Sequence, residues 1–303
     1  MNRLTLGSRG SELALLQSKQ VMNMLLEHYP HMEININIIR TQGDINLDKS
    51  LNEIGGKAAF TAELEDALIN HHIDLAVHSL KDLPSTLSGD LIYLGSPGRE
   101  DPRDVFVSTK WKTINEVPKG GTIATGSSRR KAQLIHHRPD FNIQGLRGNI
   151  DTRLRKLDEY KWDGIITAAA AMHRMGMKDK ISEYLNLTDF VPSGGQGALG
   201  LESAANREDI KPIINAIINE ETTQCCNAER SYLAHMEAGC SMPIGCWGRI
   251  EDHVFHLTGF CSSLDGIHKI QETVKGDIKD AEKLSLNLAE IMIQRGAREI
   301  MAQ

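Results

Sequence analysis

The amino-acid sequence predicts an α/β protein with two α/β domains and a smaller α+β domain at its C-terminal end. A chain of 303 residues is too long for one ordinary hydrophobic core and suits two or three domains. Strand-like and helical segments alternate along the first two thirds, which favours a largely parallel sheet. A strand, a turn rich in glycine and serine, and a helix also occur in that order twice, at residues 4–28 and 121–137.

The first domain is expected to begin with a short apolar strand at residues 4–6, followed by the turn GSRGS. Ser11 is a suitable N-cap for an amphipathic helix from about Glu12 to His28. EININIIR alternates apolar and polar residues as a strand does. DLAVHSLKDLP predicts a buried strand that stops in a loop at Lys81 and Asp82.

The second domain repeats this succession of strand, Gly/Ser-rich turn and helix in GTIATGSSRRKAQLIHH. Arg129 and Arg130 lie in the first turn of the helix. Arginine there opposes the helix dipole, which favours acidic residues at that end. A bound anion would remove the conflict, because backbone N–H groups and two guanidinium groups would converge on it. WDGIITAAAAMHRMG predicts a further strand and helix, and we interpret VPSGGQGALGLE as the segment that returns the chain to the first domain.

From residue 220 onward the pattern becomes that of a small α+β domain. TTQCCNAERSYLAHM predicts a helix, and a final helix ends the chain. Between them we expect a cysteine-containing loop and three antiparallel strands, at about 244–251, 253–261 and 267–275. The predicted domains are residues 1–97 with 198–216, residues 98–197, and residues 217–303.

Positive charge is concentrated in one segment of an otherwise acidic chain. The net charge is -6, but residues 127–156 carry eight Lys or Arg against two acids and the rest of the chain amounts to -12. This basic island indicates a localised anion site more than a general polyanion-binding surface. For Arg155 and Lys156 we prefer a solvated helix face.

Several function classes fit the sequence poorly. Aromatic residues make up 5% of the chain and do not interleave with the basic island, which argues against nucleic-acid binding. There is no GxxxxGK[ST] loop, and GSRGSE and GGQGALG are not dinucleotide fingerprints, so nucleotide hydrolysis is disfavoured. MNRLTLGSRGSELAL has neither a signal peptide nor a membrane span, which predicts a cytoplasmic protein.

Two positions at strand ends are candidates for chemistry. Asp82 follows Lys81 at the end of an expected central strand, where ligands gather in open α/β sheets. A carboxylate there could act as an acid or base, or stabilise a developing cation. The pattern alone favours a simpler alternative, a loop aspartate that pairs with Lys81 or caps the turn at Pro84. Arg9 is placed equally well for anion binding and for plain solvent exposure.

A group of arginines could bind a ligand that has several carboxylates or phosphates, because guanidinium groups form two-pronged hydrogen bonds with either. The pattern does not separate the two chemistries. The group consists of Arg129, Arg130, Arg147, Arg153 and Arg174.

The five cysteines have neither CxxC nor HxH spacing, so a disulfide framework and a zinc site are both disfavoured. Cys225 and Cys226 lie in an expected helix, and Cys246 and Cys261 lie in expected strands, so packing explains them. Cys240 differs because it lies in a loop with a glycine before it. An accessible thiol of this kind could be a nucleophile, a redox switch or an attachment point.

Motifs spread over nearly the whole chain resemble, in the same order, those of the porphobilinogen deaminase family, also called hydroxymethylbilane synthases. They are GSRGSELAL, TQGD, GGKAAF, DLAVHSLKDLP, REDPRDVFV, SSRRKAQL, LRGNIDTRLRKLD, GGQGALGLE, AERSYL and EAGCSMPIG. The resemblance implies two similar α/β lobes around a cleft, as in type-2 periplasmic binding proteins, and a small cysteine-bearing domain.

The resemblance also implies a transferase of tetrapyrrole (haem) biosynthesis that acts as a monomer and needs no metal. Four porphobilinogen molecules are deaminated and joined head to tail into hydroxymethylbilane, with release of ammonia. The product grows on a dipyrromethane cofactor, which a thioether attaches to the loop cysteine, Cys240 here. Each pyrrole carries acetate and propionate arms, which explains the need for a basic site.

Site residues carry over from the family motif by motif. Asp82 matches the catalytic aspartate, which stabilises a cationic intermediate and moves protons at the pyrrole nitrogens. The positions that match carboxylate-binding residues are Arg9, Lys81, Arg129, Arg130, Arg147, Arg153 and Arg174. The implied hydroxyl contacts are Ser11, Ser79, Thr125 and Ser127, and further contacts are Gln17, Lys57, Phe60, Asn149 and Gln196.

The chain departs from the family pattern in four motifs, slightly in PSGGQGA and EAGC and more clearly in two others. GGKAAF replaces the common GGKGLF, with Ala58 and Ala59 at the changed places, and Glu53 stands where lysine is frequent. ATGSSRR has Gly126 in place of a serine, which predicts one hydrogen bond fewer to the cofactor.

A non-catalytic cytoplasmic protein that binds a small polyanion with the same two-lobed fold is the alternative function. Both functions explain the basic island. Only the deaminase requires Asp82 and Cys240 as well, since a binding protein has no use for an attachment thiol. Nucleic-acid binding, a third possibility, predicts strongly salt-dependent association with any polyanion.

Overall fold

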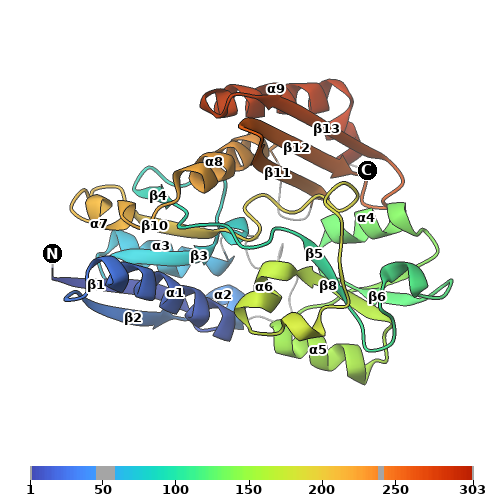
Figure 1. Cartoon of the computed structure of the whole chain (residues 1–303), viewed down its shortest axis with the longest axis horizontal. Coiled ribbons are helices and arrows are strands. Elements are labelled where there is room, and N and C mark those ends of the chain that lie inside the picture. The colour runs from blue at the N-terminus through green and yellow to red at the C-terminus, as the bar shows by residue number, and fades with distance from the viewer. Residues whose placement is uncertain (1, 46–58, 238–241, 302–303) are drawn as a thin grey trace. The chain divides into compact units, whose positions relative to one another are not determined.

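The computed structural model describes residues 2–45, 59–237 and 242–301 (Figure 1). The chain divides into two compact units. The first unit holds residues 1–99 and 198–226, and the second holds residues 100–197 and 227–303. The boundaries of the three expected domains stay a prediction.

The first unit contains a five-stranded sheet in the order β2-β1-β3-β10-β4. Strand β1 runs parallel to β2 and β3, whereas β10 runs antiparallel to both of its neighbours. The expectation of a largely parallel sheet is therefore correct except for β10, the strand that the chain enters on its return from the second unit. The strands are β1 Arg3–Arg9, β2 Glu33–Ile39, β3 Leu75–Ser79, β4 Leu91–Gly95 and β10 Leu199–Ala204.

Apolar side chains cover both faces of this sheet. Leu75 and Val77 of β3 pack with α1 in one cluster, whereas Ala76 packs with Leu64 and Leu68 of α3 in another. Helix α1 begins after Ser11 as predicted, because the Ser11 hydroxyl accepts a hydrogen bond from the Ala14 N–H at 3.3 Å. The helices of this unit are α1 Glu12–His28, α2 Gln42–Ile45, α3 Ala62–Ile69 and α7 Lys211–Asn215.

The second unit contains a five-stranded sheet built in a similar way, in the order β7-β6-β8-β5-β9. Strand β6 is parallel to β7 and β8, and β5 is antiparallel to β8 and β9. Strand β5 is the one that the chain enters from the first unit. The elements are β5 Asp104–Val107, β6 Thr122–Ala124, α4 Ser128–His137, β7 Asn142–Gln144, α5 Ile150–Glu159, β8 Gly164–Ala168, α6 Ala169–Arg174 and β9 Glu183–Tyr184.

The C-terminal elements form a three-stranded antiparallel sheet, as expected. Helix α8 leads from the first unit into the second, and α9 packs on β12 and β13 (Figure 1). The elements are α8 Glu220–His235, β11 Ile244–Glu251, β12 Val254–Ser262, β13 Lys269–Gly276, α9 Ala281–Gln294 and α10 Ala297–Met301.

Strand β11 lies close to the Gly-rich segment that precedes β10. The Cys246 N–H donates to the Pro192 carbonyl at 3.0 Å. A Cβ on Gly245 would come within 2.6 Å of that same carbonyl oxygen, so the close approach requires glycine. The buried carboxylate of Glu229 joins the same segments, since it accepts 2.6 Å hydrogen bonds from the N–H groups of Gly195 and Gly248.

Four of the five cysteines pack as predicted. Cys225 and Cys226 are buried on α8, and Cys246 and Cys261 are buried on β11 and β12. Burial raises the pKa of Cys261 to about 11, which keeps it a neutral thiol near pH 7. Cys240 lies outside the described residues.

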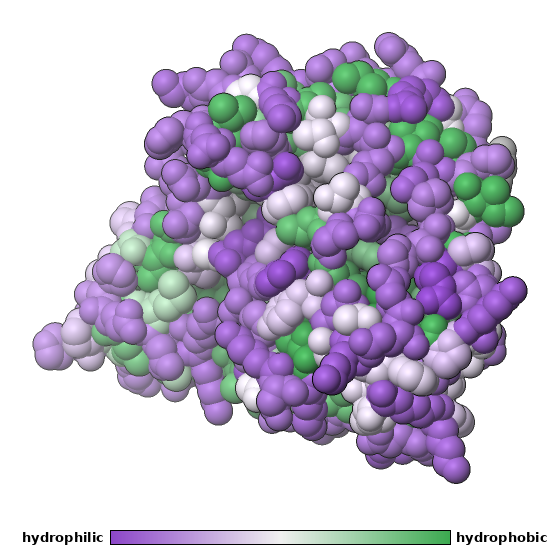
Figure 2. Space-filling view, turned by 45° about the vertical axis from the view of Figure 1, so that its right-hand side comes forward, coloured by the Kyte–Doolittle hydropathy of each residue, from purple (hydrophilic) through white to green (hydrophobic). Residues whose placement is uncertain are grey.

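The visible face of the molecule is mainly hydrophilic, with apolar side chains in small separate patches (Figure 2). Within residues 2–45, 59–237 and 242–301, no helix combines the length and the apolar character that crossing a bilayer would need.

A buried polar cluster lies between β3, β10 and α3 in the first unit. His78 Nε2 lies 2.9 Å from Glu202 Oε2, and both side chains are buried. The second Glu202 oxygen and one Glu65 oxygen are buried without a hydrogen-bond partner among the described residues. Burial raises the pKa of Glu65, and the Glu202 carboxylate adds to the rise.

Replacing Glu65 by Gln is expected to raise the melting temperature at pH 8 and to change it little at pH 4. A raised pKa in the folded state means that stability falls as pH rises through that pKa, so neutral glutamine helps only above it. The gain should be below about 1 kcal/mol, because Glu65 is partly exposed. Calorimetry at both pH values tests this, with exposed Asp66→Asn as control. An equal gain at pH 4 and pH 8 would contradict it.

Candidate functional site

The end of β3 presents the side chains for which catalysis was predicted. After Ser79 the chain makes a 3-10 turn at Leu80–Asp82, and the Leu80 N–H donates to the Ala198 carbonyl at 3.0 Å. Leu80 and Leu83 are buried with Ala198 and Cys226, and they hold the turn. Lys81 and Asp82 are only half-buried. The two leucines therefore fix the backbone from which the Asp82 carboxylate projects.

The structure does not bear out the simpler interpretation of Asp82. Among the described residues, neither Lys81 nor a turn N–H is bonded to the Asp82 carboxylate. A half-buried carboxylate without a partner among the described residues has lost part of its solvation and gains no compensating contact from them. Its position at the end of a central strand leaves it available for a ligand.

Neutral polar groups line the same strand end. The Gln17 amide donates to the Ser79 hydroxyl at 2.8 Å, and Gln17 is buried on α1. The Ser11 oxygen accepts the cap hydrogen bond of α1, and its O–H group can still donate to a ligand. These three side chains lie in one unit and provide two hydroxyl groups and an amide near the end of the sheet.

Arg9 is anchored within the first unit. Its guanidinium lies 2.5 Å from Asp44 and 4.3 Å above the Phe60 ring. The Thr41 hydroxyl donates to Asp44 at 3.0 Å. Burial alone would raise the pKa of Asp44, but Arg9 and Thr41 outweigh it and hold that pKa below its ordinary value. Simple solvent exposure of Arg9 is therefore wrong, and Phe60 packs against its guanidinium.

The N-terminus of α4 is capped in the second unit. The Ser127 hydroxyl accepts from the Arg130 N–H at 3.4 Å, and the Thr125 hydroxyl accepts from the Ser127 N–H at 3.3 Å. Gly126 stands where the family has a serine. A Cβ there would lie 2.2 Å from the Leu146 carbonyl oxygen, so the backbone as folded requires glycine.

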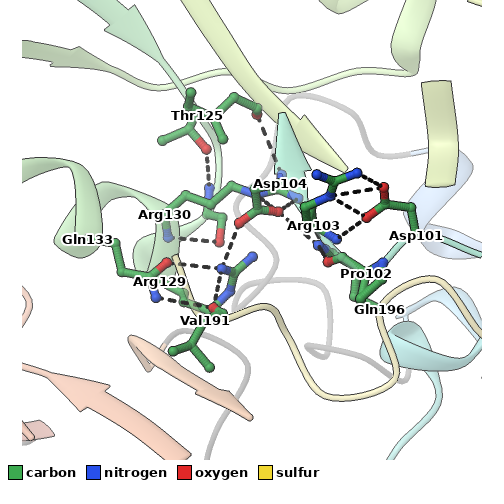
Figure 3. Close-up of polar contacts among 12 residues, drawn as sticks. Asp101, Pro102, Arg103, Asp104, Thr125, Arg129, Arg130, Gln133, Val191 and Gln196 are labelled. Carbon is green, nitrogen blue, oxygen red and sulfur yellow. Dashed lines mark hydrogen bonds and ion pairs between the residues drawn. The ribbon is translucent and has the colours of Figure 1, made fainter. Parts of the chain in front are cut away.

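Arg129 and Arg130 turn inward onto one buried carboxylate, Asp104 of β5 (Figure 3). Arg129 Nη1 lies 2.7 Å from one Asp104 oxygen, and Arg130 Nη2 lies 2.8 Å from the other. The sequence argument expected a bound anion at this helix end, and in the structure the two guanidinium groups pair with a carboxylate of the protein itself. Because one carboxylate meets two guanidinium groups, the cluster keeps one net positive charge.

Neutral side chains complete the cluster around Asp104 (Figure 3). The Gln196 amide donates to Asp104 at 2.8 Å, and its oxygen accepts from Arg130 at 3.2 Å. Arg129 also donates to Gln133 at 3.0 Å and to the Val191 carbonyl at 2.7 Å. Burial alone would raise the pKa of Asp104, but the two guanidinium charges hold it far below its ordinary range.

Asp104 was not among the predicted site residues. It lies in the REDPRDVFV motif, 25 residues before Arg129 in sequence, and no local pattern joins the two. The feature of the sequence that could have pointed to Asp104 is the REDPRDVFV motif, because it places an aspartate at the start of a buried strand. Gln196 was predicted as a contact residue, and it lies within this cluster.

The basic residues after α4 occupy a partly exposed surface near α5. Arg153 donates to the Gly148 carbonyl at 2.8 Å, and the Arg147 carbonyl accepts from Lys156 at 3.3 Å. Asn149 is the exposed N-cap residue of α5 and makes no side-chain cap hydrogen bond. Arg155 pairs with Glu159 on an exposed helix face, as predicted. Lys156 is half-buried instead.

Arg174 ends α6 and is a partly buried cation. Its guanidinium donates to the Gly197 carbonyl at 2.7 Å. Burial lowers the pKa of Arg174 to about 10, and the nearby Glu100 charge opposes that shift. No carboxylate within residues 2–45, 59–237 and 242–301 forms an ion pair with it. A partly buried guanidinium with so few partners among the described residues is suited to an incoming carboxylate.

Two predicted site residues, Lys57 and Cys240, lie outside the described residues, as do Glu53 and Ala58. The part of the chain that the structure describes contains no cluster of histidine, cysteine, aspartate or glutamate suited to a metal ion. The first unit thus offers a carboxylate that has no partner within the described part of the chain, and the second unit offers guanidinium and hydroxyl donors for an anionic ligand.

Two family models match nearly the whole chain. The model described as porphobilinogen deaminase, dipyromethane cofactor binding domain, matches residues 4–212, and the model for the C-terminal domain of porphobilinogen deaminase matches residues 223–294. A porphobilinogen deaminase of Alkaliphilus metalliredigens is 44% identical, over 99% of this chain and 95% of its own. One from Geobacter sulfurreducens is 41% identical, over 100% and 95%.

Among solved structures, the methionine-binding protein MetQ matches with a TM-score of 0.45 and 12% identity, over 73% of this chain and 92% of its own. A nutrient-binding protein of Burkholderia cenocepacia bound to methionine matches with a TM-score of 0.45 and 11% identity, over 77% and 96%.

Proposed function

The chain belongs to the porphobilinogen deaminase family, and from this premise we propose that it joins four porphobilinogen molecules head to tail into hydroxymethylbilane in tetrapyrrole biosynthesis. Ammonia is the leaving group at each step. The observation that carries the proposal in this chain is the Asp82 carboxylate, which projects half-buried and without a partner among the described residues from the end of β3.

The donors of the second unit fit a dipyrromethane cofactor, whose pyrroles carry acetate and propionate arms. Arg174 is a partly buried cation with one hydrogen bond among the described residues, and the cluster around Asp104 keeps one net positive charge. Thr125 and Ser127 place hydroxyl groups beside that cluster. When bound, the dipyrromethane supplies the primer on which the product grows. We propose that Cys240 attaches it.

Asp82 is proposed to act on the incoming substrate. Loss of ammonia from porphobilinogen leaves a cation, and an ionised carboxylate close to it lowers the free energy of that state. The same carboxylate can take a proton from a pyrrole nitrogen and return it.

The other residues predicted to contact the ligand lie partly in the first unit and partly in the second. In the first unit, Ser11, Gln17, Ser79 and Lys81 surround the strand end, and Arg9 is held by Asp44 with Phe60 beside it. We propose that they orient substrate carboxylates, together with Lys57. In the second unit we propose the same role for Arg129, Arg130, Arg147, Asn149, Arg153, Arg174 and Gln196.

We further propose that the protein works as a cytoplasmic monomer of three domains, without nucleic-acid or membrane partners. The domains are those expected from sequence, with the cofactor cysteine in the third. A gel-filtration mass near 33.6 kDa would agree with the monomer.

Intact-protein mass spectrometry tests the proposed function directly. The purified protein is expected to exceed its sequence mass by two pyrrole units, and brief incubation with porphobilinogen should add further single-pyrrole increments. Cys240→Ser should lack all of these additions. The alternative, a non-catalytic polyanion-binding protein, predicts an unmodified mass and no release of ammonia, and that result would remove the deaminase.

A further inference from the structure

The last turn of α6 meets the chain where it enters and leaves the second unit. The chain enters at Glu100 and leaves at Gly197, and the Glu100 N–H donates to the Gly197 carbonyl at 3.1 Å. The same carbonyl accepts from the Arg174 guanidinium at 2.7 Å. One oxygen atom therefore joins the entering segment, the leaving segment and a proposed substrate-binding arginine.

His173, the residue before Arg174, contacts the entering segment. Its Nδ1 lies 3.0 Å from a Glu100 carboxylate oxygen, so adjacent residues of α6 hold both segments. The contact with His173 lowers the pKa of Glu100, which stays ionised near neutral pH. The His173 side chain is 8% exposed and the Glu100 side chain is 39% exposed, so the imidazole is shielded from water and the carboxylate reaches it from the surface.

The second ring nitrogen of His173 is also bonded. Nε2 lies 2.7 Å from the Tyr184 hydroxyl, and the Arg103 guanidinium lies 4.3 Å above the Tyr184 ring. Asp101 holds that guanidinium with hydrogen bonds of 2.6 to 3.0 Å (Figure 3). The imidazole is thus fixed from two sides, by a carboxylate and by a packed phenol.

We propose that His173 and Glu100 are positioning residues for Arg174. Through the end of α6 they hold its guanidinium on the Gly197 carbonyl, so that its other N–H groups are oriented for a carboxylate of the substrate. The inference rests on the proposed function. Arg174 is the residue that would touch the ligand, and His173 acts only through it.

Replacing His173 by asparagine or by glutamine tests its contacts with Glu100 and Tyr184 separately. Asparagine places its amide near the Nδ1 position and keeps the bond to Glu100, whereas glutamine reaches the Nε2 position and keeps the bond to Tyr184. His173→Gln is expected to raise the KM for porphobilinogen about tenfold, with kcat within about twofold, which corresponds to loss of one oriented ionic contact. His173→Asn should stay within about threefold of the wild-type KM.

A double-mutant cycle with Arg174→Gln decides the mechanism. If His173 acts through Arg174, His173→Gln should change KM by less than about twofold in the Arg174→Gln background. Hydrogen exchange gives a readout without activity, since the Glu100 amide should exchange faster in His173→Gln than in His173→Asn or wild type. Exposed His72→Gln is the matched control, with wild-type values expected.

An equal rise in KM in His173→Asn and His173→Gln would overturn the inference, and so would additive effects on KM in the double-mutant cycle. Either result would mean that His173 only packs. Wild-type KM and exchange in His173→Gln would overturn it as well. Should His173→Gln fail to fold, Glu100→Gln supplies the same test, with the same tenfold rise in KM expected. These outcomes are distinct from failure of the proposed function, which would appear as a wild-type protein without adduct or turnover.

Discussion

Replacing Asp82 by Asn is expected to leave the covalent pyrrole adduct on the protein and to lower kcat by about 10²-fold or more. Asparagine has nearly the same shape, and the turn is held by Leu80 and Leu83, which the change does not touch. What is lost is the negative charge and the ability to take a proton. The effect should therefore appear in turnover and not in folding.

Single-turnover kinetics with porphobilinogen, combined with the intact mass of each variant, measure this expectation. Asp90→Asn is the matched control, because Asp90 is an exposed aspartate of the same unit. It should keep wild-type turnover. Turnover of Asp82→Asn within about threefold of wild type would show that neither charge nor proton transfer at this position matters.

Replacing Asp104 by Asn is expected to destabilise the second unit by about 3–5 kcal/mol. The side chain of Asp104 is fully buried, and the change would leave Arg129 and Arg130 buried without a counter-charge. An amide keeps one acceptor oxygen and places a donor against a guanidinium. A buried unpaired cation is among the costliest defects that a fold can carry.

The effect of Asp104→Asn should depend on pH in a defined direction. The folded-state pKa of Asp104 is depressed, so its contribution is complete above its unfolded pKa of about 4 and is lost only as pH falls toward the folded value. The difference in melting temperature from wild type should be constant from pH 5 to pH 8 and narrow in stronger acid.

Asp140→Asn is the matched control for Asp104→Asn. Asp140 also pairs with an arginine, Arg138, but at the surface of the same unit. Its loss should change the melting temperature little, since solvated ion pairs contribute little. If calorimetry shows equal destabilisation by both substitutions, burial does not determine how much the Asp104 ion pairs contribute to stability.

Local structure was predictable because it depends on residues close in sequence. The Ser11 cap, the helix after it and the three strands at the C-terminal end follow from periodicity and cap chemistry within a few positions. The antiparallel direction of β10 was not predictable in this way. Strand direction depends on where the chain comes from, and β10 is entered from the second unit.

The site was predictable in part. Motif resemblance named Asp82 and the arginines, but pattern alone favoured an Asp82 paired with Lys81. The described structure instead leaves the Asp82 carboxylate without a partner. For Arg129 and Arg130, the helix position predicted a bound anion, whereas in the structure both guanidinium groups pair with Asp104 of β5. The bound anion stays a prediction.

The sequence by itself determined the succession of elements, the position of the basic island and the family, since each depends on residue order alone. Tertiary structure decided how the charges pair. Asp104 lies 25 residues from Arg129, and Glu100 lies 73 residues from His173. Electrostatic contacts depend on distance in space and on burial, and only the packed sheets bring these residues together.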